Sequence, residues 1–388
     1  MTISVCLATT TFPRWKDDGE GAFVWGLAHS LSLAGVKVRV VSLHTPEALH
    51  KEVIEGIEVV RPSYWWPSSK ELLRKERGGL PVTLRRYPLA QLQFVPFFAI
   101  HTATIARIAR TCDIIHAHWT LSAGAAIAGQ AWHGRPVLAT VQGSDILQVA
   151  RHPLGARLTH AILTRCFHVT ALSGALADAT EEVGVDRQHI SVIPNGVDIQ
   201  QFQPPQTPRD KLILFVGSCI ERKGICYLLQ ALPDIFARLP GYRAVIIGDG
   251  PLRGELEALS NGLGLENRVS FHGFLPQSEI RRWMQRARLF VLPSLEEGQG
   301  VVSLEAMACG TPVLASAVDG ICEVVTPDVG RLVPPRNPAM LTQAAIEILE
   351  TDANWHNLSI AARQRAVEVY DWETITQHYL TLYERALS

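Results

Sequence analysis

The sequence predicts an α/β protein with two doubly wound domains, each built on a parallel sheet. Three observations support this fold class. The 388 residues amount to about 2.6 times a typical domain. Short β-branched runs alternate with longer amphipathic segments, which is typical of parallel sheets covered by helices. This alternation stops at a Pro-rich polar stretch and then begins again.

The first half contains six short apolar runs with the length and composition of strands. A helix is predicted over 22–34, because an amphipathic segment follows a Gly-rich loop there and ends at Gly35, a residue typical of helix C-termini. The predicted strands are 3–8, 36–43, 114–118, 136–141, 168–171 and 191–193.

The second half begins after residues 202–210, Phe-Gln-Pro-Pro-Gln-Thr-Pro-Arg-Asp, which have the composition of an interdomain linker. A helix is predicted over 225–239, and a long helical tail over 338–388. Ligands of doubly wound sheets bind beyond the carboxyl ends of the strands, so facing domains would place a site between them. The predicted strands are 211–216, 242–247, 269–272, 289–292, 312–315 and 330–333.

The composition excludes several classes of protein. With 47% hydrophobic and 19% charged residues and a net charge of −1, the chain is neither disordered nor globally suited to nucleic acid. The seven cysteines are scattered without a C-x-x-C pair, which predicts buried, reduced thiols. The start of the chain lacks the basic region of a signal peptide, and no run approaches about 18 uninterrupted apolar residues. We therefore expect a cytoplasmic protein.

The segment 293–312 is the richest in chemistry. It predicts a strand end, a loop with Gly298 and Gly300, and a helix that starts near Val301. Glycines allow close approach to the backbone, and a helix N-terminus offers N–H groups to an anion. Glu297 and Glu305 would flank that anion, which suits the diphosphate of a nucleotide sugar. The alternative is a capped surface helix with solvated glutamates.

The run from Glu297 to Glu305 resembles the E-x7-E signature of the retaining glycosyltransferases of family 4, which have the two-domain GT-B fold. Other stretches resemble the same family in the same order over nearly the whole chain. They are Phe-Pro-Arg at 12–14, Gly-Glu-Gly-Ala-Phe-Val at 19–24, Ile-His-Ala-His-Trp at 115–119, Thr-Val-Gln-Gly-Ser-Asp at 140–145, Ile-Pro-Asn-Gly-Val-Asp at 193–198, the phosphate loop at 216–224, Gly-Asp-Gly-Pro at 248–251 and Phe-His-Gly at 271–273.

The resemblance implies four parts. Residues 1–195 would be an acceptor-side Rossmann-like domain, 196–210 a linker, and 211–365 the nucleotide-sugar-binding domain. Residues 366–388 would form a terminal helix that crosses back to the first domain.

The resemblance also implies roles for individual residues. Glu305 would bind the ribose hydroxyls, Glu297 would lie beside the transferred sugar, and Lys223 would neutralise the departing diphosphate. The expected catalytic residues are Glu297, Lys223 and His118. The expected donor-binding residues are Glu305, Gly21, Ser218, Arg222, Gly248, Gly250, Gly298, Gln299, Gly300, Val301 and Val302.

Two positions depart from the family pattern. Ser218 stands where an Arg is common, so Arg222 would have to supply the second cation. Gln142 stands where many relatives have His, and an amide cannot shuttle a proton. Gln142 and Asp145 are expected on the acceptor side, and Asp145 either points towards the acceptor or caps the segment that follows. His118 either serves the site or is a hydrogen-bonded structural histidine.

No metal or other cofactor is expected besides the nucleotide sugar as co-substrate. Asp17, Asp18 and Glu20 lie at a predicted helix start, where acids commonly interact with the helix dipole and with solvent. No D-x-D follows a strand, and the resemblance implies a metal-independent reaction.

The region from Arg61 to Tyr87 carries seven basic against two acidic residues and includes Trp65 and Trp66, with Phe94 to Phe98 close behind. A basic, aromatic-rich surface predicts contact between Arg61–Phe98 and an anionic membrane or a lipid-linked acceptor. The alternative is a solvated helix with both tryptophans packed beneath it. The basic residues are Arg61, Lys70, Arg74, Lys75, Arg77, Arg85 and Arg86.

The resemblance implies a retaining glycosyltransferase that moves a sugar to a hydroxyl acceptor, in the synthesis of an exopolysaccharide or another cell-envelope glycan. A nucleotide-sugar epimerase or a phosphorylase on the same architecture is the closest enzyme alternative. A non-catalytic binding or scaffold protein of the same fold is the other, favoured by Ser218 and Gln142. A dinucleotide dehydrogenase is disfavoured because neither half has G-x-G-x-x-G at its first helix.

Overall fold

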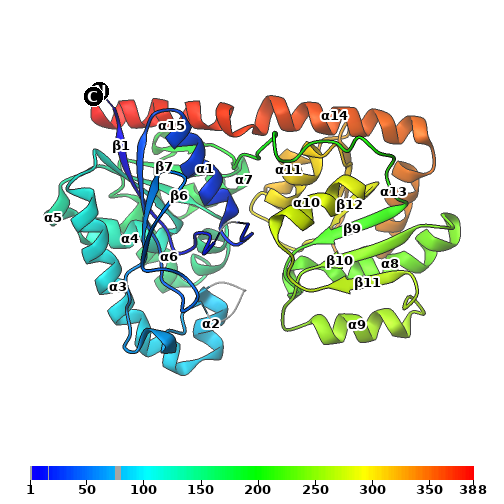
Figure 1. Ribbon diagram of the computed structural model, residues 1–388, viewed down its shortest axis with the longest axis horizontal. Helices are drawn as coiled ribbons and strands as arrows, with labels where there is room; N and C mark the ends of the chain where they lie inside the picture. The colour runs from blue at the N-terminus through cyan, green and yellow to red at the C-terminus, as the bar shows by residue number, and fades with distance from the viewer. Residues whose placement is uncertain (1, 16, 75–79) are drawn as a thin grey trace. The chain divides into compact units, whose positions relative to one another are not determined.

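The computed structural model describes residues 2–15, 17–74 and 80–388. The chain forms two compact units (Figure 1). Unit 1 contains Met1–Asn195 and Glu373–Ser388, and unit 2 contains Gly196–Trp372. Each unit has its own sheet with helices on both faces, which confirms the predicted α/β class with two doubly wound domains.

Unit 1 is built on an eight-stranded sheet with the order β3-β4-β2-β1-β5-β6-β7-β8. All neighbouring strands are parallel except the pair β3 and β4. The central strands are fully buried because they are covered on both faces. The strands are β1 (Ser4–Ala8), β2 (Lys37–Val41), β3 (Lys51–Ile54), β4 (Ile57–Val60), β5 (Ile114–His118), β6 (Val137–Val141), β7 (His168–Ala171) and β8 (Ile190–Val192).

The helices of unit 1 cover its sheet in two groups. The helices α3, α4 and α6 pack together, whereas α1 packs against β2 and is joined to α15 by a 2.7 Å hydrogen bond from Thr376 to Ser30. The helices are α1 (Ala22–Leu33), α2 (Leu80–Arg86), α3 (Pro88–Ala109), α4 (Trp119–Ala128), α5 (Gln130–His133), α6 (Pro153–Leu163), α7 (Gly174–Glu182) and α15 (Trp372–Leu387).

The antiparallel hairpin of β3 and β4 is absent from the sequence prediction. Its two-residue turn is Glu55-Gly56, and both residues have positive φ, 47° and 85°. Such a turn is usually signalled by Asn-Gly or Asp-Gly. Glu-Gly carries a weaker signal, and the strands are only four residues each.

Unit 2 is built on a six-stranded, fully parallel sheet with the order β11-β10-β9-β12-β13-β14. The helix α8 packs against α9 and α13, whereas α11 packs against α10 and α14 (Figure 1). The elements are β9 (Leu212–Val216), α8 (Ile225–Arg238), β10 (Arg243–Ile247), α9 (Arg253–Gly262), β11 (Val269–His272), α10 (Gln277–Arg286), β12 (Leu289–Leu292), α11 (Val301–Ala308), β13 (Val313–Ser316), α12 (Ile321–Val324), β14 (Gly330–Val333), α13 (Pro338–Leu349) and α14 (Asp352–Tyr370).

Residues 196–210, predicted as a linker, make close contacts within unit 2. The Val197 N–H donates to the Tyr370 carbonyl at 2.7 Å, and the Arg209 guanidinium donates to the Gln285 and Ala287 carbonyls, both at 2.9 Å. The helix predicted from residue 366 begins instead at Trp372, because Asp371 has an extended conformation that ends α14.

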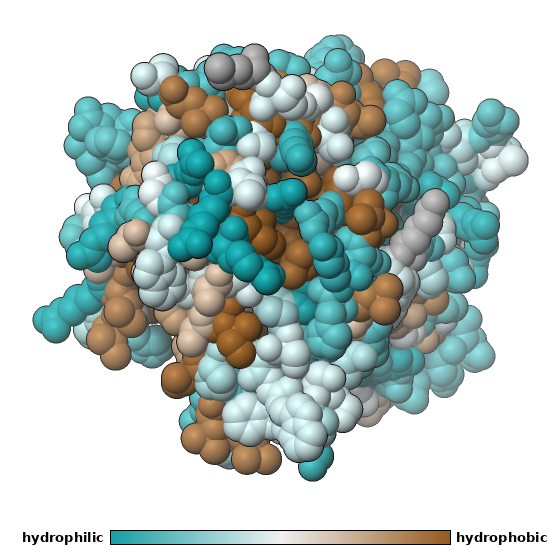
Figure 2. Space-filling view, turned by 60° about the vertical axis from the view of Figure 1, so that its left-hand side comes forward, coloured by the Kyte–Doolittle hydropathy of each residue, from teal (hydrophilic) through white to brown (hydrophobic). Residues whose placement is uncertain are grey.

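The long helix α3 lies against the core of unit 1. It is long and apolar enough to cross a membrane by length and composition alone, but 44% of its most apolar window is buried. Phe97, His101 and Ile105 are buried on one side, while Leu89, Leu92 and other residues are exposed on the other. Figure 2 shows hydrophobic side chains that reach the surface among hydrophilic ones on the face it displays.

Candidate functional site

Each unit has one point where neighbouring strands lead away in opposite directions, and ligands of such sheets bind there. In unit 1 this point lies between β1 and β5, and in unit 2 between β9 and β12. His118 is the last residue of β5 in unit 1, and the segments that follow β9 and β12 in unit 2 carry Lys223 and Glu297. The topology thus places the predicted catalytic residues at the ligand-binding edge of their own sheets.

Glycines let three loops at the carboxyl edge of the sheet of unit 2 pack against one another. A Cβ on Gly248 would lie 2.0 Å from the Gly217 carbonyl oxygen, and one on Gly224 would lie 2.0 Å from the Pro293 carbonyl oxygen. Gly248 also has a φ of 133°, which side-chain-bearing residues rarely adopt. The loops after β9, β10 and β12 can therefore meet only with glycine at these positions.

Glu297 is held by several groups of unit 2. Its carboxylate accepts hydrogen bonds from the Lys223 ammonium and, at 3.2 Å, from the Ser294 hydroxyl. Its own N–H donates to the Asp319 carboxylate at 3.0 Å. Burial acts to raise the pKa of Glu297, but Lys223, Arg222 and Ser294 outweigh burial and leave the pKa below its ordinary value. Glu297 is therefore ionised near neutral pH, and both cations of the loop after β9 act on it.

Glu305 lies on α11 in the opposite electrostatic environment. It is buried, and its Oε1 accepts a 2.6 Å hydrogen bond from the Gln277 amide at the start of α10. Burial raises the pKa of Glu305 to about 8, and the Gln277 hydrogen bond only partly opposes this. Carboxyl groups whose pKa is shifted in this way are frequent in functional sites.

The remaining predicted donor-binding residues of unit 2 lie around these two glutamates. Gly300 precedes α11 with a φ of 80° and no side-chain cap, and its carbonyl accepts the Ser303 N–H at 2.8 Å, so the N–H groups without an acceptor in the helix are those of Val301 and Val302. Gln299 is buried, and Gly298 and Val302 are half-buried. The Leu295 N–H donates to the Arg222 carbonyl at 2.7 Å. The loops that carry Ser218, Arg222 and Gly250 therefore belong to the same cluster.

His118 ends β5 in unit 1 and is almost fully buried, with 1% of its surface exposed. Its Nδ1 lies 2.9 Å from the Gln142 amide nitrogen, and its Nε2 has no hydrogen-bond partner among the residues that the structure describes. Burial lowers its pKa to about 3, so the ring is neutral. The next residue, Trp119, has a φ of 64°, a strained conformation of the kind found at functional sites.

The carboxylate of Asp145 is hydrogen-bonded to the backbone of unit 1. Its carboxylate accepts hydrogen bonds of 3.0 Å from the backbone N–H groups of Thr120, Gln142 and Gly143. It thereby joins the loops after β5 and β6. Of the two sequence-based alternatives, these contacts favour the capping role.

His116 belongs to a separate buried network that anchors α15. Its Nδ1 lies 2.7 Å from the Tyr383 hydroxyl and its Nε2 lies 2.6 Å from the Thr140 hydroxyl. Both ring nitrogens of His116 are therefore used structurally, and of these two histidines it is His118 whose Nε2 has no partner among the described residues.

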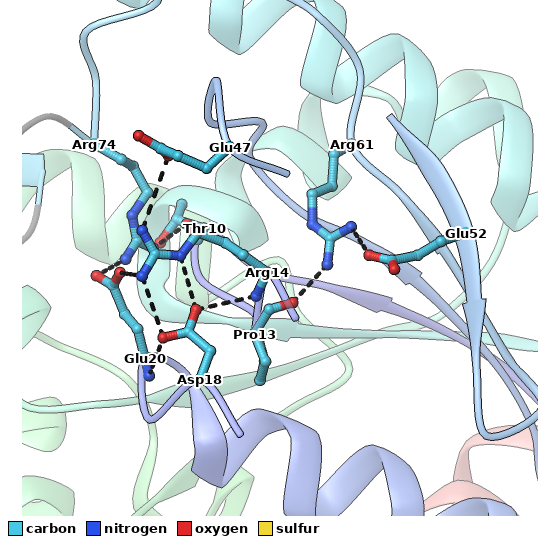
Figure 3. Close-up of polar contacts among 9 residues, drawn as sticks. All are labelled: Thr10, Pro13, Arg14, Asp18, Glu20, Glu47, Glu52, Arg61 and Arg74. Atoms are coloured by element: carbon cyan, nitrogen blue, oxygen red, sulfur yellow. Dashed lines mark hydrogen bonds and ion pairs between the residues drawn. The ribbon is translucent and has the colours of Figure 1, made fainter. Parts of the chain in front are cut away.

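The loop before α1 is fixed by charges. Gly21 has a φ of 78°, and its Cβ position would lie 3.0 Å from the Phe12 backbone. Figure 3 shows that Arg14 and Arg74 converge on Asp18 and Glu20. These acids are ion-pair partners of arginines rather than solvated helix-dipole partners. In residues 2–15, 17–74 and 80–388 no group of three His, Cys, Asp or Glu side chains is placed to hold a metal ion.

The basic region of the sequence is less exposed than predicted. Arg61 is buried, and its guanidinium contacts Glu52 and donates to the Pro13 carbonyl at 2.6 Å (Figure 3). Arg74 is held by Glu20 and by the Thr10 carbonyl. Lys75 and Arg77 lie outside the described residues. The alternative of packed tryptophans also fails, because Trp66 is 90% exposed.

Sequence reasoning missed two residues of unit 2. Gln277 bonds Glu305, and Asp319, which has a φ of 40°, bonds the backbone of Glu297. The signal for Asp319 was available, since an Asp-Gly pair follows the predicted strand 312–315. The sequence carries no signal for Gln277, because an amide residue at the start of a helix is common.

Comparisons with known proteins agree with this geometry. Sucrose-phosphate synthase from Thermosynechococcus elongatus is similar over 99% of this chain and 98% of its own, with a TM-score of 0.79 and 26% identity. Anabaena Alr3699/HepE, solved in complex with UDP-glucose, shares the fold over 98% of this chain and 99% of its own, with a TM-score of 0.73 and 21% identity. Two Rossmann-like units of this kind define the GT-B class of glycosyltransferases.

Family models identify the chain more closely. The model described as Glycosyltransferase Family 4 matches residues 18–201, and that described as Glycosyl transferases group 1 matches residues 197–365. D-inositol 3-phosphate glycosyltransferase from Frankia alni is 31% identical over 71% of this chain and 75% of its own length. The chain belongs to glycosyltransferase family 4. It spans about half the length of the first curated relatives that it matches, 46% and 54%.

Proposed function

We propose that this protein is a retaining glycosyltransferase that moves a sugar from a nucleotide-diphosphate sugar to an acceptor hydroxyl. One observation carries the proposal: at the carboxyl edge of the sheet of unit 2, a lysine–glutamate ion pair joins the segments after β9 and β12, and a second, buried carboxyl lies on α11, the helix that follows β12. The similarity to HepE, which was solved with UDP-glucose, makes UDP the first nucleotide to test.

Each group suits one part of such a donor. Lys223 and Arg222 neutralise the charge that develops on the departing diphosphate, and the start of α11 supplies N–H groups to the same anion. Glu305 accepts hydrogen bonds from ribose hydroxyls. Glu297 lies beside the sugar and stabilises its developing positive charge. A leaving-group oxygen accepts the proton of the acceptor hydroxyl on the same face, so the anomeric configuration is retained.

Nucleotide binding tests the donor site. Thermal unfolding is measured with UDP, GDP, ADP, CDP and dTDP for the wild type, for Glu305→Ala and for Glu266→Ala, an exposed glutamate of unit 2 as the matched control. A ligand at 100 times its dissociation constant stabilises by about 2.7 kcal/mol. We expect one nucleotide to stabilise the wild type and the control but not Glu305→Ala. No response to any of them would favour the binding-protein alternative.

Turnover tests the chemistry. With the nucleotide identified above, hydrolysis or transfer of its sugars is measured for the wild type and for Glu297→Ala. We expect Glu297→Ala to lower kcat much more than it weakens nucleotide binding. Equal rates for both proteins would contradict the assignment of Glu297.

We further propose that the product is a cell-envelope glycan and that unit 1 contacts the anionic, cytoplasmic face of a membrane. Leu89, Leu92 and Val95 are 64%, 66% and 72% exposed along α3, and Trp66 is 90% exposed. The sequence has no acidic residue from 77 to 112, where it has five arginines. An apolar row within a positive segment suits an anionic lipid surface.

Co-sedimentation with vesicles tests this contact. We expect binding to vesicles that contain anionic lipid and little binding to neutral ones, with at least a tenfold loss in Leu92→Glu/Val95→Glu. The matched control is Leu154→Glu/Leu158→Glu on α6, whose leucines are 70% and 55% exposed. Equal binding to both vesicle types, or equal losses in both variants, would contradict the proposal.

A further inference from the structure

The ring of His118 is a buried group with one nitrogen left over. The side chain is 1% exposed, its Nδ1 faces Gln142 at 2.9 Å, and its Nε2 is unpartnered among the described residues. A buried polar atom without a partner is costly, and in a site it commonly marks where a ligand binds. Whether Nε2 donates a hydrogen bond to a ligand or accepts one from it depends on which ring nitrogen carries the proton.

Gln142 decides this point. As the Gln142 amide is oriented in the structure, its nitrogen lies 2.9 Å from Nδ1; because an amide nitrogen can only donate, this orientation makes Nδ1 the acceptor, without a proton. Burial keeps the pKa of His118 at about 3, so the ring carries one proton near neutral pH. That proton is then on Nε2, the nitrogen without a partner.

The groups packed around His118 do not oppose this arrangement. His116 stacks on it with ring centroids 4.6 Å apart, and burial lowers the pKa of His116 well below its ordinary value, so that ring is also neutral. The Asp145 carboxylate accepts from three backbone N–H groups, one of them that of Gln142 itself. Asp145 therefore fixes the backbone of Gln142 and leaves its amide side chain to His118.

We propose that Gln142 is a positioning residue that keeps His118 in the Nε2–H tautomer, so that His118 donates a hydrogen bond to a sugar oxygen. The oxygen belongs to the transferred sugar or to the acceptor, and both are hydroxyl-rich. A histidine at position 142 could donate or accept, whereas the amide in this chain fixes one direction. The inference rests on the proposed function, and its first test does not depend on turnover.

The first test is spectroscopic. The protein is labelled with ¹⁵N-histidine, and among the 14 histidines the His118 signals are those missing from His118→Asn. From pH 5.5 to 8 we expect a protonated Nε2 and an unprotonated Nδ1 in the wild type. The opposite tautomer, or a doubly protonated ring, would overturn the inference even if the enzyme transfers sugar.

The second test reverses the hydrogen bond. In Gln142→Glu the carboxylate can only accept, so the proton should move to Nδ1 and Nε2 should lose its donor role at pH 8. In Gln142→Met, Nδ1 loses its partner but no group draws the proton away from Nε2. We expect kcat/KM to fall at least tenfold in the Glu variant and less in the Met variant, with nucleotide binding unchanged in both.

Gln188→Met is the matched control, because Gln188 is exposed in unit 1 and its amide donates to the Asp186 carboxylate at 2.8 Å. We expect wild-type kcat/KM and wild-type His118 signals in this variant. A purely structural role of Gln142 predicts that Met, which makes no hydrogen bond, is the worse replacement. Unchanged His118 signals together with wild-type kcat/KM in Gln142→Glu would overturn the inference. If the wild type itself transferred no sugar, the proposed function would fail, while the tautomer would still be read from the spectrum.

Discussion

Replacement of Glu305 by glutamine should make unit 2 more stable at neutral pH. Glutamine has the same shape and keeps an oxygen that can accept the 2.6 Å hydrogen bond from Gln277. What Glu305→Gln removes is the ionisation of a buried carboxyl. The free energy of unfolding of the variant should therefore exceed that of the wild type wherever the wild-type carboxyl is ionised in the unfolded chain.

The magnitude follows from the pKa of Glu305, which burial raises from 4.5 to about 8. Below pH 4.5 the carboxyl is protonated in both states and contributes nothing. As the pH rises, the unfolded chain ionises first, so the native state loses stability until the pH passes about 8. One pKa unit corresponds to about 1.4 kcal/mol, so the loss is about 3 kcal/mol at pH 7 and about 1 kcal/mol at pH 5.

Thermal unfolding without nucleotide measures this difference. For a domain of this size about 1 kcal/mol shifts Tm by roughly 2–4 °C. Glu305→Gln should therefore unfold about 6–12 °C above the wild type at pH 7 and about 2–4 °C above it at pH 5. Glu266→Gln, at an exposed position of the same unit, should follow the wild type at every pH. Parallel curves of Tm against pH for the wild type and Glu305→Gln would refute the reasoning.

Further substitutions have defined outcomes. Lys223→Met leaves buried Glu297 without its ion pair, so the free energy of unfolding measured in urea should fall by about 3 kcal/mol. Adding Glu297→Gln should restore most of that free energy. Gly248→Ala forces a Cβ against a carbonyl oxygen at 2.0 Å and should lower Tm sharply, whereas Gly254→Ala, in α9 with open space around it, should raise stability by about 0.5–1 kcal/mol. Tyr383→Phe removes a hydrogen bond to buried His116 and should lower the free energy of unfolding in urea by about 1–3 kcal/mol.

The parallel strands could be predicted because both of their faces are buried, which produces near-continuous apolar runs. The runs at 212–216 and 289–292 are of this kind, and every residue in them is buried. The hairpin of β3 and β4 lies at the edge of its sheet, and β3 has no fully buried residue. Edge position and an unusual Glu-Gly turn leave little pattern for sequence analysis to detect.

The candidate site could be predicted where chemistry follows a strand directly. Lys223 and Glu297 follow β9 and β12, and the order of the strands makes those loops neighbours. The contact of Gln277 with Glu305 could not be predicted, because it joins residues 28 positions apart on two different helices and depends on the direction of each side chain. The same holds for the pairing of Arg61 with Glu52, which turns a predicted surface cation into a buried one.

The two glutamates of one signature have opposite electrostatic environments, and this separates their tasks. Glu297 faces two cations that keep its pKa below the ordinary value, so it is ionised near neutral pH, as the proposed stabilisation of positive charge on a sugar requires. Glu305 accepts a hydrogen bond from the neutral Gln277 amide, and burial raises its pKa, so it holds its proton up to a pH of about 8. Two carboxyls whose pKa values are driven apart by their surroundings commonly have different roles in a site. Hydroxyl groups that donate to Glu305 would favour its ionised form, so nucleotide binding near pH 7 should release a proton, and binding should tighten as the pH rises towards 8.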